Sequence, residues 1–235
     1  MGYAAILGLG ALGSTTLAEY DLACRTWRYA GYGDYPFKLP FYERNIRPHM
    51  RSPDDIIVVT EAALLGDRGG WGGVTESLAR RYHDALMEGQ EAYASAKGEA
   101  MADDRWPGLF ILHGGAIGAA NQLNRMGATV CVFSGIDRDL LYHAMLKRGL
   151  GIDSAIRDDA EVGIKSWLME LAGEGFEPGM AVVYDDRRKR LEALKDGGFD
   201  VVASREGHDH PMDLAGIRHA KLEDFPKMLG EVLGI

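Results

Sequence analysis

Three short stretches of the chain carry residues that could do chemistry. Gly8-Leu9-Gly10-Ala11-Leu12-Gly13 follows an apolar segment and has the spacing G-x-G-x-x-G, which lets a backbone approach a pyrophosphate. Asp185 and Asp186 follow another apolar segment, and two adjacent carboxylates can hold a divalent cation or transfer a proton. Ser134 ends a third apolar segment, and its hydroxyl can donate to a phosphate oxygen.

The pattern of strands and helices predicts that these residues meet at one edge of a sheet. Residues 3–7, 128–133 and 181–184 are apolar runs without alternation, which is typical of strands buried on both faces. Helical patterns separate them, which favours a parallel α/β sheet whose first strand lies at the N-terminus. Because parallel strands end at the same edge, the glycine turn, Ser134 and the acidic pair are expected to converge there.

A mainly helical insert is predicted over residues 16–101, between the two parts of an α/β core formed by residues 1–15 and 102–235. Ser52-Pro53-Asp54-Asp55 has the capping hydroxyl, the proline and the acids of a helix start. Residues 30–51, rich in Tyr, Gly, Pro and Arg, are predicted to be loop with short helical pieces. The remaining predicted helices are 75–96, 116–126, 139–148, 164–171, 188–196 and 222–233, and the remaining predicted strands are 201–203 and 217–220.

Composition excludes several classes of function. The chain has 26 Lys and Arg against 35 Asp and Glu, and the net charge of -9 disfavours binding to nucleic acid or to an anionic membrane. No apolar run reaches the roughly 18 residues of a membrane span, and the N-terminus lacks the basic segment of a signal peptide. Two cysteines are too few for a disulfide framework, so the sequence predicts a cytoplasmic protein.

The order of these segments resembles the haloacid dehalogenase superfamily, in its branch of phosphoglycolate-phosphatase and β-phosphoglucomutase-like proteins. The resemblance covers almost the whole chain and implies a Rossmannoid parallel sheet core with an inserted helical cap, hydrolysis of phosphate esters and a Mg²⁺ cofactor. It rests on AAILGLGALGSTTLAEYD, an insert of cap size, Pro107-Gly108-Leu109, VCVFSG with Ser134, and VVYDDRRKRLEALKDGGFDVV with Asp185-Asp186.

The chain departs from the family's D-x-D pattern at its two acidic positions, which are Gly8 and Gly10 here. The resemblance implies that the first acid attacks phosphorus and binds Mg²⁺, and that the second protonates the leaving group. Glycine can do neither. The family lysine has no clean match either, because ungapped counting from Asp186 places Glu161 there and the nearest lysine is Lys165.

The resemblance still implies a ligand site at the sheet edge. Its predicted phosphate or ligand contacts are Ser134, Lys165, Gly8 and Gly10, and its predicted metal ligands, for weakly bound Mg²⁺, are Asp185 and Asp186. A purely structural hypothesis is that these residues serve only as strand ends and helix caps.

Three functions remain open. The leading hypothesis is a catalytically impaired hydrolase-like protein that acts by binding or regulation, with a small anionic ligand or a protein partner. The alternative is an active phosphatase on a small phosphate ester, in which Asp185 or Asp186 and a divalent metal activate water. The second alternative, a dinucleotide-binding protein, needs an acidic residue about 20 positions beyond the turn. The segment found there, residues 26–34, is aromatic and broken by glycine.

Other clusters support weaker hypotheses. His208-Asp209-His210 could bind a transition metal but is typical of a solvated loop. Arg44, Arg47 and Arg51 could clamp an anion, although a basic loop paired with acidic neighbours is the simpler interpretation.

His113-Gly114-Gly115 is similar to an oxyanion segment, but the chain has no G-x-S-x-G, and Cys131 is expected to be a core residue. The basic run Arg187-Arg188-Lys189-Arg190 could form ion pairs with Asp185 and Asp186, which would make the acidic site structural. The aromatic segment 27–35 is compatible with a homodimer.

Overall fold

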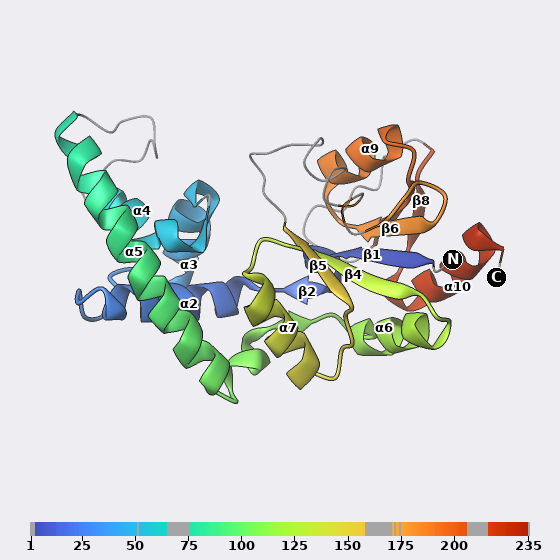
Figure 1. The fold of residues 1–235 in the computed structure, drawn as a ribbon, viewed down its shortest axis with the longest axis horizontal. Helices are drawn as coiled ribbons and strands as arrows, with labels where there is room; N and C mark the ends of the chain where they lie inside the picture. The colour runs from blue at the N-terminus through green and yellow to red at the C-terminus, as the bar shows by residue number, and fades with distance from the viewer. Residues whose placement is uncertain are drawn as a thin grey trace. The chain divides into compact units, whose positions relative to one another are not determined.

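The computed structural model describes residues 3–50, 52–64, 76–157, 171, 173, 175–205 and 216–234. The chain divides into two compact units (Figure 1). Unit 1 comprises Met1–Thr15 and Phe110–Ile235, and unit 2 comprises Thr16–Leu109. The sequence places the insert at residues 16–101, and its role as a cap stays a prediction.

Unit 1 is built on a six-stranded sheet in which every neighbouring pair of strands is parallel. The central strand is β1 (Ala4–Gly8), which pairs with β4 on one side and with β6 on the other. The full order is β5 (Ser154–Arg157), β4 (Thr129–Ser134), β1, β6 (Ala181–Asp185), β7 (Asp200–Ser204) and β8 (Arg218–Ala220). The parallel α/β core predicted from the unalternated apolar runs is confirmed.

Helices cover both faces of this sheet, as Figure 1 shows for α9 (Arg188–Asp196) on one face and α6 (Ala116–Arg125) and α7 (Arg138–Lys147) on the other. Successive residues of β6 point to opposite faces. Val183 packs in a cluster with Leu194 of α9, whereas the Tyr184 ring lies 4.9 Å from the ring of Phe225. Phe225 begins α10 (Phe225–Leu233), which follows the 3-10 turn η6 (Leu222–Asp224). Burial on both faces explains why these strands lack alternation.

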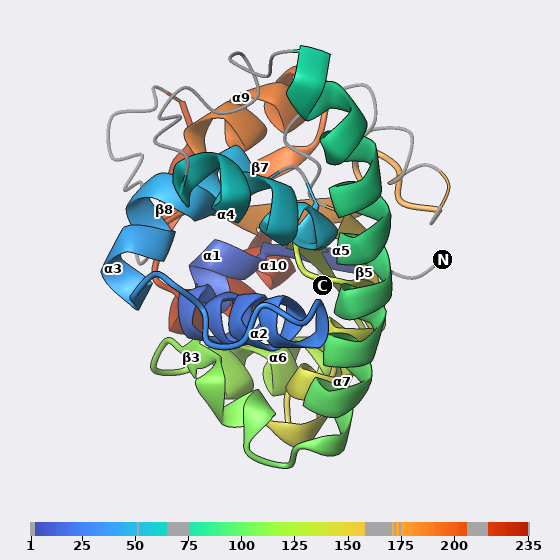
Figure 2. The same cartoon turned by 90° about the vertical axis from the view of Figure 1, so that its left-hand side faces the viewer.

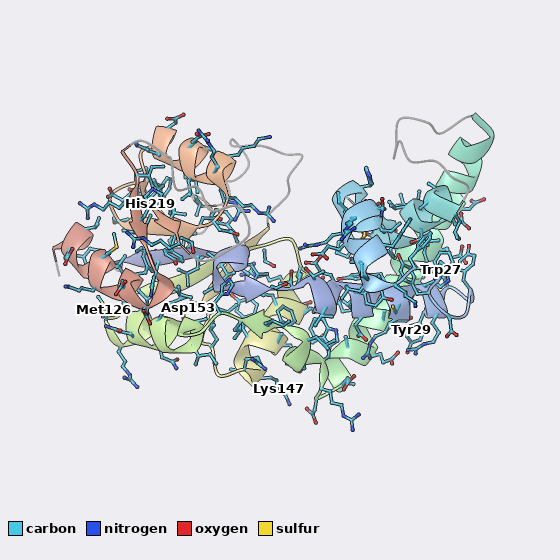
Figure 3. The ribbon with its side chains drawn as sticks, turned by 180° about the vertical axis from the view of Figure 1, so that it is seen from behind. Trp27, Tyr29, Met126, Lys147, Asp153 and His219 are labelled. Atoms are coloured by element: carbon cyan, nitrogen blue, oxygen red, sulfur yellow. The ribbon has the colours of Figure 1, made fainter. Side chains whose placement is uncertain are left out.

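A second, two-stranded sheet lies where the chain passes between the units. Strand β2 (Gly13–Ser14) follows the single-turn helix α1 (Leu9–Leu12) and pairs antiparallel with β3 (Ile111–Leu112). The sequence did not predict this pair. The sequence also did not predict the edge strand β5. Just before this strand, the carboxylate of Asp153 (Figure 3) accepts the Val130 N–H of β4 at 2.7 Å.

Unit 2 is helical, as predicted. Helices α2 (Thr16–Tyr29) and α5 (Glu76–Ala102) pack side by side (Figure 2). Ion pairs join them. Arg25 pairs with Asp21 of its own helix, with Glu99 of α5 and with Asp103 just after α5, and Arg28 also pairs with Glu99. The other elements are α3 (Leu39–Phe41), the π-helical turn η1 (Tyr42–Ile46), the 3-10 turns η2 (Arg47–His49), η3 (Pro53–Asp55) and η5 (Trp106–Leu109), and α4 (Ile56–Leu64).

The predicted helix start at Ser52 is confirmed, since the Ser52 N–H donates to the Asp55 carboxylate at 2.9 Å in a capping box. Among the helices that the structure describes, none combines the length and the apolar character needed to cross a bilayer.

Two glycines of α5 offer a matched test of packing in unit 2. A Cβ at Gly89 would collide with the carbonyl oxygen of Asp54 in η3, whereas a Cβ at Gly98 would meet nothing within 4 Å. Gly98→Ala is therefore expected to stabilise the protein by roughly 0.5–1 kcal/mol, the helix preference of alanine over glycine. Gly89→Ala is expected to lower the free energy of unfolding by about 1–3 kcal/mol, because η3 must move. Urea denaturation measures both, and an equal gain from the two variants would contradict the tight contact.

Candidate functional site

The carboxyl ends of three neighbouring strands bring the predicted site residues together. In the sheet register Gly8 of β1 lies opposite Phe133 of β4, one residue before Ser134. On the other side Leu7 lies opposite Tyr184 of β6, one residue before Asp185. The strand order changes direction at β1, and this is the position where open parallel sheets bind ligands. Lys165, together with Glu161 and the predicted helix 164–171, lies outside the described residues.

The carboxylate of Asp185 lies in the space that a side chain at position 8 would need. A Cβ built on Gly8 would be 2.5 Å from Asp185 Cγ and 2.6 and 2.7 Å from its two carboxylate oxygens. A real Cβ atom essentially never lies within 3.0 Å of such an atom, so a side chain at position 8 would force a neighbour to move. Glycine at position 8 is therefore a requirement of packing, and the acidic group at this point of the site comes from β6 rather than from β1.

The other two glycines of the motif also make room for a neighbour. A Cβ on Gly10 would lie 2.7 and 2.8 Å from the two carboxylate oxygens of Asp186. A Cβ on Gly13 would run into the backbone of Ile111 and Leu112, the strand that pairs with it. The close approach of a neighbouring group therefore explains why each of the three positions is a glycine. Two of the three contacts are with carboxylates, which would repel an anionic pyrophosphate.

Arg190 forms a buried ion pair with Asp185. Its Nη1 donates to Asp185 Oδ2 at 2.7 Å, and the Arg187 backbone N–H donates to Asp185 Oδ1 at 2.9 Å, so both oxygens of the carboxylate are engaged. The exposed fraction is 2% for Arg190 and 0% for Asp185. The guanidinium also lies over the Phe133 ring, with its central carbon 4.8 Å from the centroid. Arg190 is thus tied to both β6 and β4.

Burial governs the electrostatics of this pair. Burial raises the pKa of Asp185, the charge of Arg190 opposes that rise, and the neighbouring carboxylate of Asp186 adds to it. A buried carboxylate needs a cation or several donors close by, and Arg190 with the Arg187 N–H provides both.

Ser134 uses its hydroxyl within its own turn. The Ile136 N–H donates to Ser134 Oγ at 3.0 Å, and the residue is 2% exposed. The structure therefore places Ser134 at the predicted edge as the residue that stabilises the turn after β4. Binding of a phosphate by its hydroxyl stays a prediction.

The described residues do not fit a divalent metal. Mg²⁺ prefers near-octahedral oxygen coordination, with one or two carboxylates available as ligands. Gly8 supplies no carboxylate, and both oxygens of Asp185 are bound to donors. Within the described part of the chain, no three His, Cys, Asp or Glu side chains are grouped so that they could hold a metal ion.

The structure describes only some members of the remaining predicted clusters. Arg47 pairs with Glu19 inside unit 2, with its Nε 2.5 Å from the Glu19 carboxylate, as the simpler interpretation of the basic loop predicted. Cys131 is a core residue of β4, as expected. Arg51 and the loop with His208, Asp209 and His210 lie outside the described residues.

Sequence reasoning did not name Arg190 as a site residue, although it raised ion pairing between the basic run and the acidic pair. That ion pairing is confirmed for Arg190 and Asp185. The sequence signal that could have identified Arg190 is its position in the helical repeat of α9. Arg187, Arg188 and Lys189 are exposed, and Arg190 is the one residue of the run on the face of α9 that turns toward the sheet.

Alanine at position 8 tests whether the Asp185 carboxylate fills that space. Gly8→Ala is expected to lower the free energy of unfolding by about 1–3 kcal/mol, because the methyl group and the carboxylate cannot both fit. Gly114→Ala in the same unit is the control, since a Cβ there meets nothing within 4 Å. Chemical denaturation compares the two, and equal stabilities would mean that Asp185 is not held beside Gly8.

Comparisons with known proteins agree on the fold. No family model matches the chain, and no curated protein matches it in sequence. Solved structures match over nearly their full length. One described as a phosphoglycolate phosphatase from Haemophilus somnus has a TM-score of 0.61, 10% identity and 97% coverage of each chain. One described as a β-phosphoglucomutase from Thermotoga maritima has a TM-score of 0.58 and 15% identity, covering 99% of this chain and 100% of its own.

A hydrolase of the haloacid dehalogenase superfamily from Geobacter sulfurreducens has a TM-score of 0.55 and 11% identity, with 97% of each chain covered. These identities are too low to carry an activity from one protein to another, but the likeness spans the whole chain. The protein therefore has the fold of the haloacid dehalogenase-like hydrolases, as its sequence pattern predicted.

Proposed function

We propose that the protein is a non-catalytic relative of the hydrolases that share its fold, and that it acts by binding or regulation. The observation that carries the proposal is the Asp185 carboxylate beside Gly8. A nucleophilic carboxylate must be accessible to the phosphorus atom. Asp185 is fully buried, and both of its oxygens are already bonded to Arg190 and to the Arg187 N–H.

The same geometry favours a protein partner over a small anion. An anion in the glycine turn would meet the carboxylates that lie beside Gly8 and Gly10, and the Arg190 charge is already paired. The charge of -9 argues against nucleic acid and anionic membranes, and a cytoplasmic location stays part of the proposal. Unit 2 also presents two aromatic side chains that suit a homodimer or another protein. Tyr29, labelled in Figure 3, and Tyr32 are 48% and 41% exposed.

One observation favours a second candidate, an active hydrolase. The Asp186 carboxylate lies beside Gly10, so an acidic group is present at the point where the resemblance implies a general acid. In this candidate Asp186 would exchange a proton with a leaving group or a water molecule. Gly8 has no side chain to act as a nucleophile and Asp185 is buried in an ion pair, which is why the non-catalytic function is the main proposal.

The dinucleotide hypothesis has less support. Its glycines should let a backbone approach a pyrophosphate at the start of a helix. Here they accommodate Asp185, Asp186 and the β3 backbone. The motif itself contains a single helical turn, Leu9–Leu12, and β2 separates it from the long helix α2. No rise in melting temperature is therefore expected with millimolar NAD(H).

Phosphate release separates the two main candidates. Wild type is assayed with a broad panel of small phosphate esters, with Mg²⁺ and with a chelator, beside Asp186→Ala and the exposed control Asp196→Ala. Because Gly8 has no side chain and Asp185 is buried in an ion pair, we expect no release above background in any protein. Turnover in wild type and in Asp196→Ala that is lost in Asp186→Ala would overturn the proposal and establish the hydrolase. Equal traces in all three proteins would identify a contaminant.

A further inference from the structure

The two adjacent carboxylates at the end of β6 need a positive charge. Asp185 is 0% exposed and Asp186 is 4% exposed. Two such groups side by side in a medium of low dielectric constant repel each other, and removing them from water is costly. The positive charge beside two buried carboxylates can come from a bound divalent ion or from a basic side chain.

Arg190 is placed to supply that charge. It lies in the first turn of α9, five residues after Asp185, and its guanidinium reaches back to the carboxyl ends of the strands. The contact with Asp185 is 2.7 Å long, and the Phe133 ring packs against the guanidinium at 4.8 Å. Phe133 is itself opposite Gly8 in the sheet, so the arginine charge lies among β1, β4 and β6.

We propose that Arg190 is a built-in cation that replaces a divalent metal at this site. The arginine neutralises Asp185 and lowers the net charge of the pair, so the folded protein needs no metal and excludes one. Loss of the guanidinium leaves the buried Asp185 carboxylate without its cation, next to a second buried carboxylate, and that turns the pair into a divalent-cation site. The inference rests on the ion pair and the packing of the glycines, and it holds whether the protein is a binder or an enzyme.

The test is the melting temperature with and without Mn²⁺ or Mg²⁺, for wild type and for Arg190→Ala. Wild type is expected to show no shift. Arg190→Ala is expected to melt at a lower temperature and to recover roughly 5–10 °C when the Mn²⁺ concentration is about a hundred times its dissociation constant. Binding of Mn²⁺ to the variant, followed by its electron paramagnetic resonance spectrum, gives a second readout that does not depend on stability.

Two further variants serve as controls. Arg188→Ala removes an exposed arginine of the same run that pairs with Glu192, and it is expected to behave as wild type. Asp185→Asn/Arg190→Gln removes both charges of the pair with little change in volume. It is expected to fold and to show no response to Mn²⁺, because the carboxylate needed for the metal is gone.

Each outcome decides the proposal. A metal-induced rise in wild type equal to that in Arg190→Ala would overturn it, as would a folded Arg190→Ala that does not respond to metal. If Arg190→Ala does not fold, Arg190→Gln is compared with the double variant. If Arg190→Gln is unfolded and the double variant is folded, the result supports charge neutralisation by Arg190. If the two variants are equally unfolded, the result overturns it. Because none of these readouts is phosphate release, failure here is distinguishable from failure of the proposed function.

Discussion

The ion pair between Arg190 and Asp185 is the interaction on which the site depends. Both side chains of the pair are buried. Removing one partner of such a pair costs about 3–5 kcal/mol, because the other charge is left without compensation. The pair joins the first turn of α9 to the end of β6, and the packing of Phe133 against the guanidinium extends the connection to β4. These contacts hold α9 against the ends of β6 and β4.

The glycines and the aspartates form a set that is matched in size. Gly8 and Gly10 have no side chains, and the carboxylates of Asp185 and Asp186 fill the space that is left. Replacing either glycine by an acid without changing its neighbour would place two carboxylates in one volume. The acidic groups beside Gly8 and Gly10 therefore come from β6 and the residue that follows it.

The fold could be predicted from the sequence because its strands are buried on both faces. Residues 128–133 and 181–184 are unbroken apolar runs. Such runs, when helices separate them, are typical of a parallel α/β sheet and of few other folds. Strand β5 was missed because Ser154–Arg157 is a short edge strand that contains a serine and an arginine, and pairing with β4 stabilises it more than its own composition does. The β2–β3 pair has only two residues on each side and joins distant parts of the chain, so no local pattern indicates it.

The candidate site was less predictable than the fold. Spacing alone placed Gly8, Ser134 and Asp185 at one sheet edge, because strand ends are set by the fold. Which groups bond to one another depends on side-chain directions over distances of a few ångströms. The sequence therefore left open whether the Asp185 carboxylate would meet a metal, an arginine or water. A charged run such as residues 187–190 is usually solvated, and its one buried member can be identified only when the face of α9 is known.

The position of β1 has a consequence for how the chain folds. This strand is made first, yet Ala4 pairs with Thr129 on one side and with Ala181 on the other. The central strand of the sheet therefore has no partner until the whole of unit 2 and the segment beyond it have been synthesised. Unit 2 is continuous from Thr16 to Leu109, so it can form before the partners of β1 have been synthesised. Unit 2 is thus expected to be the earlier of the two units to acquire structure during synthesis, and closure of the sheet around β1 is expected to be the late, slow step.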